Sequence, residues 1–125
     1  MKALVVDDAK DIAYYISETL MEVEGMEVDQ AHSRAEADAA EAANEYDLYI
    51  VDVYLAGLDK KPDGLEFVRN IRKSKPGAKI ILMTGKSFSR ILTDVLFKAG
   101  SAELLAKPVS LDTLLTTVRR VIGKK

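Results

Sequence analysis

Polar side chains that could act together follow the apolar runs of this sequence. In chain order they are Asp7, Asp8, Asp52, Thr84 and Lys107. Three neighbouring carboxylates repel one another, so in a folded protein they need a cation or raised pKa values. Oxygen ligands in a chain without cysteine favour a hard divalent ion, most naturally magnesium, which takes few protein ligands. A single Asp at a strand end is most often a turn or capping residue, so it is the set that argues for chemistry.

The segments that must position these residues are short apolar runs rich in β-branched side chains, which predict buried strands. Strong runs cover residues 3–6, 48–51 and 79–84, and weaker ones cover 26–31 and 103–106. Strands that are apolar throughout must be covered on both faces, as in a parallel sheet. The alternating run at 26–31 instead indicates a strand with one solvated face at the sheet edge.

Segments of helical character separate these runs. Apolar side chains recur at helical spacing over 12–23, 88–96 (Phe88 to Leu96) and 111–122; further helices are expected over 33–44 and 63–73. Ser33 and Glu36 have the spacing of a capping box, and Ser110 is suited to cap the last helix. Gly25 is suited to end the first helix.

Five strands therefore alternate with five helices. Short connections between strands and helices force parallel pairing with right-handed crossovers. The prediction is an α/β flavodoxin-like fold, a doubly wound five-stranded parallel sheet of strand order 2-1-3-4-5 within three layers. No repeat or linker interrupts the chain, so one domain is expected over residues 1–125. Ligands of such sheets bind at the carboxyl ends of the strands, where the five polar residues should meet.

The composition argues against several classes of protein. Hydrophobic residues make up 48% of the 125 residues and charged residues 30%, an ordinary globular balance. The net charge of −2 lacks the basic footprint of a nucleic-acid-binding domain, so direct nucleic-acid binding is not expected. No apolar run is long enough to span a bilayer, and the absence of cysteine fits a reducing compartment, so we expect a cytoplasmic protein without membrane contact.

The sequence resembles the receiver domain of two-component response regulators over essentially its whole length, through one ordered set: Asp7-Asp8, Asp52, Thr84 and Lys107-Pro108. The resemblance implies that Asp52 is the phosphoacceptor in a magnesium-dependent phosphorelay. The donor would be a sensor histidine kinase or a phosphotransfer protein. The metal would be bound directly by Asp8, largely through water by Asp7, and by Asp52 and the backbone carbonyl of Tyr54.

The resemblance also implies how the phosphorylated state acts. Thr84 would close onto a phosphoryl oxygen, and Lys107 would pair with the phosphoryl group, aimed by a cis bond to Pro108. These contacts bias a two-state arrangement and change a partner-binding surface. The output would be a downstream protein target or a fused effector domain, and a phosphorylation-dependent homodimer stays open. The domain would catalyse only its own phosphorylation and dephosphorylation, unlike a conventional enzyme.

Two segments depart from the family pattern. Asp52 and Gly64 lie twelve residues apart, about four more than is usual in this family. Leu58–Pro62 is therefore interpreted as an insertion in the loop after the third strand. It is either a partner contact or a tolerated surface loop, since added loop length costs little. Leu104 stands where the family usually places an aromatic side chain that swings inward on activation. Either core packing or a different switching movement is compatible with leucine there.

Single positions carry further expectations. Tyr54 and Lys86 lie two residues past Asp52 and Thr84, at positions that influence phosphoryl lifetime in this family, and the bulk of Tyr54 is expected to hinder the attacking water. His32 is the sole histidine and is interpreted as structural. The Phe88–Leu96 stripe is interpreted mainly as a core face, and part of it, with Phe97, Leu104 and the last helix, is compatible with a partner surface.

Other functions on the same fold are weighed against the receiver. A receiver-like interaction module that works without phosphorylation would tolerate loss of some of the five polar residues. A hydrolase of small phosphate esters would need a second Asp where Tyr54 stands. Flavin binding would need a Ser/Thr/Gly-rich turn after the first strand, where the paired acids would instead repel a phosphate. Whether the chain is a stand-alone regulator or the receiver of a longer protein stays open.

Overall fold

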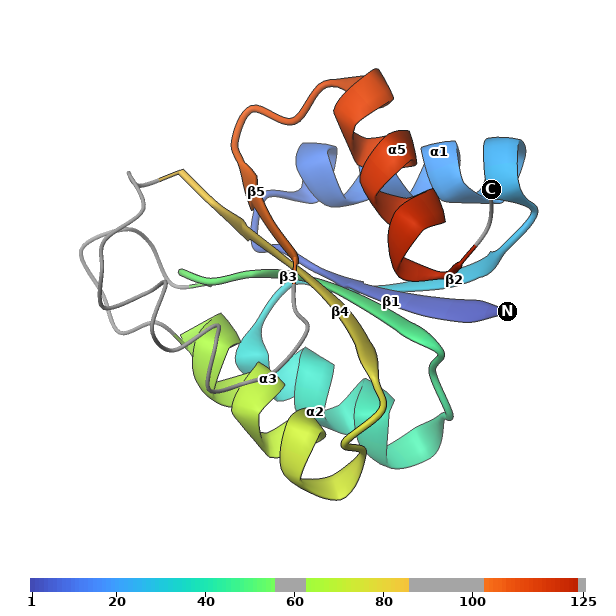
Figure 1. Ribbon diagram of the computed structural model, residues 1–125. Coiled ribbons are helices and arrows are strands. Elements are labelled where there is room, and N and C mark those ends of the chain that lie inside the picture. The colour runs from blue at the N-terminus through green and yellow to red at the C-terminus, as the bar shows by residue number, and fades with distance from the viewer. Residues whose placement is uncertain (56–62, 86–102, 124–125) are drawn as a thin grey trace.

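Strands and helices alternate along the chain (Figure 1). The computed structural model describes residues 1–55, 63–85 and 103–123. The elements are β1 (Lys2–Val6), α1 (Lys10–Glu24), β2 (Glu27–Ala31), α2 (Arg34–Ala43), β3 (Leu48–Asp52), α3 (Asp63–Ser74), β4 (Lys79–Thr84), β5 (Glu103–Ala106) and α5 (Leu111–Val121). The helix expected over 88–96 lies outside the described residues, as does the insertion at Leu58–Pro62.

The five strands form one parallel sheet in the order β2-β1-β3-β4-β5, which confirms the predicted topology. Central strands β1, β3 and β4 are buried almost throughout, because helices cover both of their faces. Strand β2 lies at the edge and keeps polar residues exposed, as the alternating pattern predicted. Charged and polar side chains on an edge strand also discourage pairing with another chain.

Two hydrophobic cores lie on opposite faces of the sheet. Successive side chains of a strand point to opposite faces, so each strand feeds both cores. On β1, Ala3 and Val5 pack with α1 and α5, whereas Leu4 and Val6 pack in the cluster of α2 and α3. Figure 1 shows these two helix pairs on either side of the sheet. The result is the predicted three-layer sandwich.

The helix ends follow the signals in the sequence. Ser33 Oγ accepts a hydrogen bond from the Glu36 amide at 3.1 Å, and Ser110 Oγ accepts one from the Thr113 amide at 3.2 Å. The Glu36 carboxylate completes the first cap by accepting from the His32 amide at 3.0 Å. Gly25 ends α1 with a φ of +65°, a conformation that costs glycine little. None of the helices in the described residues combines the length and apolarity needed to cross a bilayer.

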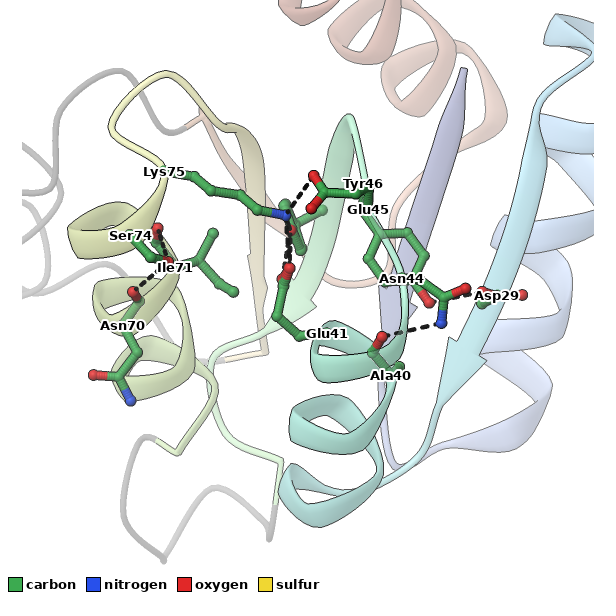
Figure 2. Close-up of polar contacts among 11 residues, drawn as sticks. Asp29, Ala40, Glu41, Asn44, Glu45, Tyr46, Asn70, Ile71, Ser74 and Lys75 are labelled. Carbon is green, nitrogen blue, oxygen red and sulfur yellow. Dashed lines mark hydrogen bonds and ion pairs between the residues drawn. The ribbon is translucent and has the colours of Figure 1, made fainter.

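A polar network ties α2, β3 and α3 together at the end of the sheet away from the acidic residues. The Lys75 side chain reaches from the end of α3 toward Glu41 on α2 (Figure 2), with Nζ 2.7 Å from Glu41 Oε1. Lys75 Nζ also lies 2.9 Å from the hydroxyl of Tyr49, which itself donates to Glu41 Oε1 at 2.8 Å. Burial, together with the hydrogen bond to Glu41, raises the pKa of Tyr49 to about 12. The hydroxyl is therefore neutral and bound to both members of an ion pair.

We expect Tyr49→Phe to lower the free energy of unfolding by about 1–2 kcal/mol, because it removes hydrogen bonds to charged partners from a buried ring. Urea unfolding measures the change. The matched control is Tyr14→Phe on the exposed face of α1, which should leave stability unchanged. Equal stability of the two variants would contradict a stabilising role for this network.

Candidate functional site

The acidic residues meet at the carboxyl ends of two neighbouring strands. Asp7 directly follows β1, and Asp52 is the last residue of β3, which pairs with β1 in parallel. Both residues are buried, with 0% and 5% of their surface exposed, whereas Asp8 is exposed. Backbone amides orient the buried pair: Asp7 Oδ1 accepts from Ala9 at 2.9 Å, and Asp52 Oδ1 accepts from Tyr54 at 3.2 Å.

The three carboxylates are close enough to share a cation. One oxygen from each of Asp7, Asp8 and Asp52 lies within 4.8 Å of the others. An octahedral Mg²⁺ with ligands about 2.1 Å away separates its ligand oxygens by roughly 3–4 Å, so the cluster needs only a small contraction. All three ligands are carboxylate oxygens, and Asp8 is exposed to water. Such a site suits a hard divalent ion, which binds oxygen and keeps several water ligands. These residues could therefore hold a metal.

Lys107 supplies the positive charge within the acidic cluster. Its Nζ lies 2.7 Å from Asp7 Oδ2 and 3.1 Å from Asp52 Oδ2. Burial by itself would lower the pKa of Lys107, but the ion pairs with Asp7 and Asp52 outweigh it and raise the pKa. The lysine therefore stays charged and offsets part of the repulsion between two buried carboxylates.

Opposing influences act on the Asp52 carboxyl group. Burial favours its neutral form and raises its pKa, and the charge of Asp7 acts in the same direction. Lys107 and the amide of Tyr54 lower the pKa, without fully offsetting burial. The charged carboxylate thus depends on the lysine beside it.

Strands β4 and β5 bring Thr84 and Lys107 to the same edge of the sheet. Thr84 ends β4, is fully buried, and accepts a hydrogen bond at its carbonyl from the Lys107 amide at 2.9 Å. The peptide bond between Lys107 and Pro108 is cis, as the resemblance implied. Tyr54 follows β3 and is half-buried against the core of α2 and α3. The predicted site residues therefore share one edge, with four charged side chains forming a cluster.

Gly64 is a site residue whose importance the sequence analysis missed. A Cβ at this position would lie 1.8 Å from the carbonyl oxygen of Asp52 and 2.8 Å from its carbonyl carbon. The Gly64 amide also donates to the Val53 carbonyl at 3.0 Å. The first turn of α3 thus rests on the backbone of Asp52, and only glycine fits. Glycine lowers the stability of a helix relative to alanine. Its presence at position 64, within the helix predicted over 63–73, was therefore the signal available in the sequence.

Leu104 serves as a core residue in this structure. It lies opposite Leu82 on β4 and packs, partly buried, against the cluster beneath α2 and α3. Lys86 and the Phe88–Leu96 stripe lie outside the described residues. His32 joins the cap of α2, and its Nε2 lies 3.2 Å from Gln30 Oε1, which agrees with a structural role.

Comparison with known proteins decides the family. The family model described as the response regulator receiver domain matches residues 3–119. The chain belongs to this family. A receiver is a signalling domain rather than a conventional enzyme, and phosphorylation and magnesium dependence are typical of the family.

Relatives of this receiver include longer proteins. It is 32% identical over 120 residues to the uncharacterized transcriptional regulatory protein YkoG of Bacillus subtilis (strain 168), covering 95% of this chain and 50% of YkoG. The chain thus spans about half the length of this relative and of several other curated relatives.

Solved structures share the receiver fold. One is a CheY-like receiver domain protein from Methanospirillum hungatei JF-1, with a TM-score of 0.83 and 28% identity over 98% of this chain and 93% of that one. Another is a response regulator from Burkholderia pseudomallei with a phosphorylated aspartic acid, calcium ion and citrate. Its TM-score is 0.76, with 28% identity over 98% of this chain and 71% of that one.

We expect Gly64→Ala to lower the free energy of unfolding by about 1–3 kcal/mol, because the new methyl group must displace either α3 or the backbone of Asp52. The matched control is Gly77→Ala, where a Cβ meets nothing within 4 Å and φ is not positive. Urea unfolding of both variants measures the difference. If the alanine at position 64 is tolerated as well as the one at position 77, the close approach of α3 to the backbone of Asp52 is wrong.

Proposed function

We propose that this receiver, one domain over residues 1–125, accepts a phosphoryl group on Asp52 and thereby switches a partner-binding surface. The observation that carries the proposal is the buried Asp52 carboxylate, 3.1 Å from Lys107 Nζ and clustered with Asp7 and Asp8. The similar Burkholderia pseudomallei structure, with its phosphorylated aspartic acid and calcium ion, supports this role for an acidic site. The alternative, an interaction module without phosphorylation, leaves the cost of burying these charges unexplained.

The proposed reaction is a phosphoryl transfer to the carboxylate. A bond forms between an Asp52 carboxylate oxygen and phosphorus, while the bond from phosphorus to the donor breaks and the donor keeps the electron pair. Asp7, Asp8, Asp52 and the backbone carbonyl of Tyr54 would hold Mg²⁺, which when bound neutralises charge on the phosphoryl oxygens. Lys107 adds a second positive charge at the same place, so the chain contributes positioning and electrostatics.

The acyl phosphate would change the balance of charge that the resting site maintains. It brings about two negative charges and several acceptor oxygens to the position of Asp52. Lys107 would exchange its contact with the Asp52 carboxylate for one with the phosphoryl group, and Thr84 would donate a hydrogen bond to it. Because the Lys107 amide is bonded to the carbonyl of Thr84, the two residues would move as a unit. Water attack on the phosphoryl group, assisted by the same charges, would reset the domain.

The proposal includes the partners and the location that the sequence predicted. The donor is a sensor histidine kinase or a phosphotransfer protein, and the reaction takes place in the cytoplasm. The output passes to a downstream protein target or to an effector domain of a longer chain. Several curated relatives that extend well beyond this length are named as transcriptional regulatory proteins, which favours the second route for them.

Incubation with acetyl phosphate and Mg²⁺ should add one phosphate, measured by intact mass. The gain should be lost in Asp52→Asn and in the presence of a chelator, because the nucleophile or the metal is then absent. Asp112→Asn, at an exposed position on α5, is the matched control and should keep the gain. No gain in the wild type, or a gain that survives Asp52→Asn, contradicts the assignment. Sustained phosphate release at many turnovers per second would instead indicate a phosphate-ester hydrolase.

We expect Tyr54→Asn to shorten the lifetime of the phosphorylated state severalfold. Tyr54 is half-buried, lies two residues past Asp52, and donates its amide to the Asp52 carboxylate, so we expect the bulk of its side chain to hinder an attacking water. Decay of the phosphorylated protein after removal of the donor, followed by intact mass, measures the effect. Tyr54→Phe keeps the bulk and should keep the lifetime. Unchanged or slower decay in Tyr54→Asn rejects shielding by the ring.

A further inference from the structure

The Arg34 side chain connects the first residue of α2 to the first turn of α3. Its Nε donates to Asp38 Oδ1 at 3.0 Å, on its own helix. Its Nη1 reaches across to α3, 3.3 Å from the carbonyl oxygen of Asp63 and 3.3 Å from Glu66 Oε1. The guanidinium carbon lies 5.9 Å from the centre of the Phe67 ring, which is buried in the core. One side chain therefore makes four contacts that fix two helices relative to each other.

The geometry of these contacts requires a guanidinium. Asp38 orients the group on α2 through Nε, which leaves Nη1 free to bind α3, so two different nitrogens serve the two helices. Only 22% of the Arg34 side chain is exposed, whereas the side chains of Asp38 and Glu66 are 54% and 64% exposed, so the clamp lies at the protein surface. A lysine has a single nitrogen and could not hold both helices in this manner.

The turn that Arg34 holds is the turn that supports the acceptor. Gly64 lies next to Asp63, and its Cα stands so close to the Asp52 carbonyl that no side chain fits between them. Gly64 lies twelve residues after Asp52, and a connection of this length does not by itself determine where the helix begins. Tertiary contacts must do so, and Arg34 makes them from the neighbouring helix on the same face of the sheet (Figure 1).

We propose that Arg34 is a positioning residue for phosphorylation: by clamping the first turn of α3 it holds Gly64 against the backbone of Asp52 and so keeps the acceptor carboxylate in line with Lys107. The inference rests on the proposed function of Asp52. A shift of the clamped turn would move the acceptor relative to the cation and the lysine. Misplacement of about 1 Å can cost up to about a hundredfold in rate, even when it originates far from the chemistry.

The experiment compares Arg34→Ala with Arg72→Ala. Arg72 lies on the same helix but holds its other end, through Nη1 bonds of 2.8 Å to the Pro76 carbonyl and 2.6 Å to the Ala78 carbonyl. Both substitutions remove a guanidinium clamp from α3, but only the first should affect the acceptor. Urea unfolding identifies conditions in which both variants are fully folded, and all further measurements use those conditions.

Two measurements then separate positioning from stability. Amide hydrogen exchange of Gly64 and Tyr54 reports local opening beside Asp52, with Ile50 in the middle of β3 as the reporter of global unfolding. The rate of phosphorylation by saturating acetyl phosphate and Mg²⁺ reports the chemistry. In Arg34→Ala we expect exchange of Gly64 and Tyr54 to accelerate relative to Ile50, and phosphorylation to slow by about tenfold or more. Arg34→Lys should stay close to the rate of Arg34→Ala, because a single nitrogen cannot hold both helices.

Each outcome decides the proposal. The proposal is supported if Arg34→Ala shows faster amide exchange of Gly64 and Tyr54 together with slower phosphorylation, and if Arg72→Ala shows neither effect. Equal behaviour of the two variants overturns it, and so does faster exchange with an unchanged phosphorylation rate, which would make Arg34 a purely structural residue. A wild-type protein that takes no phosphate contradicts the proposed function of Asp52 and, with it, the role of Arg34. In that case the exchange data still show separately whether the clamp exists.

Discussion

The balance between buried carboxylates and one lysine is the constraint on which the site depends. Asp7 and Asp52 are almost fully buried at neighbouring strand ends, where their charges repel and water cannot screen them. Lys107, whose Nζ lies within 3.1 Å of both, follows edge strand β5 and supplies the opposing charge. Under the proposed function, a phosphoryl group on Asp52 would add negative charge to this balance, and the same lysine would then face it.

The parallel sheet makes this arrangement accessible to residues far apart in the chain. Asp7 follows β1, Asp52 is the last residue of β3, and Lys107 follows β5. Because the strands are parallel, their carboxyl ends all lie along one edge of the sheet. The opposite end of the sheet carries a different kind of polar group. There Tyr49, Glu41 and Lys75 hydrogen-bond one another and tie two helices to the sheet. The acidic edge instead gathers three carboxylates around one lysine.

Helix α3 links these two regions and carries much of the positioning. Its first turn lies against the backbone of Asp52 through Gly64, and its last residues lead to Lys75 in the polar network. Arg34 from α2 holds the first turn and Arg72 the last, so each end of the helix is fixed by a guanidinium. Leu104, at the position where related domains often place an aromatic residue, packs with the same core. A shift of the Asp52 backbone would therefore press on the first turn of α3.

The sequence by itself determined the strands, the helix caps and the polar residues of the edge, because strand periodicity, Ser33 and Ser110 caps and strand-end acids are local signals. Topology followed from short crossovers, which leave few arrangements of a parallel sheet. Only the tertiary structure decided that Gly64 must lack a side chain and that Arg34 reaches α3. Those facts depend on distances between segments separated by about a dozen residues or more, and no local pattern encodes such distances. The same holds for the pKa of Asp52, which burial and Lys107 set together.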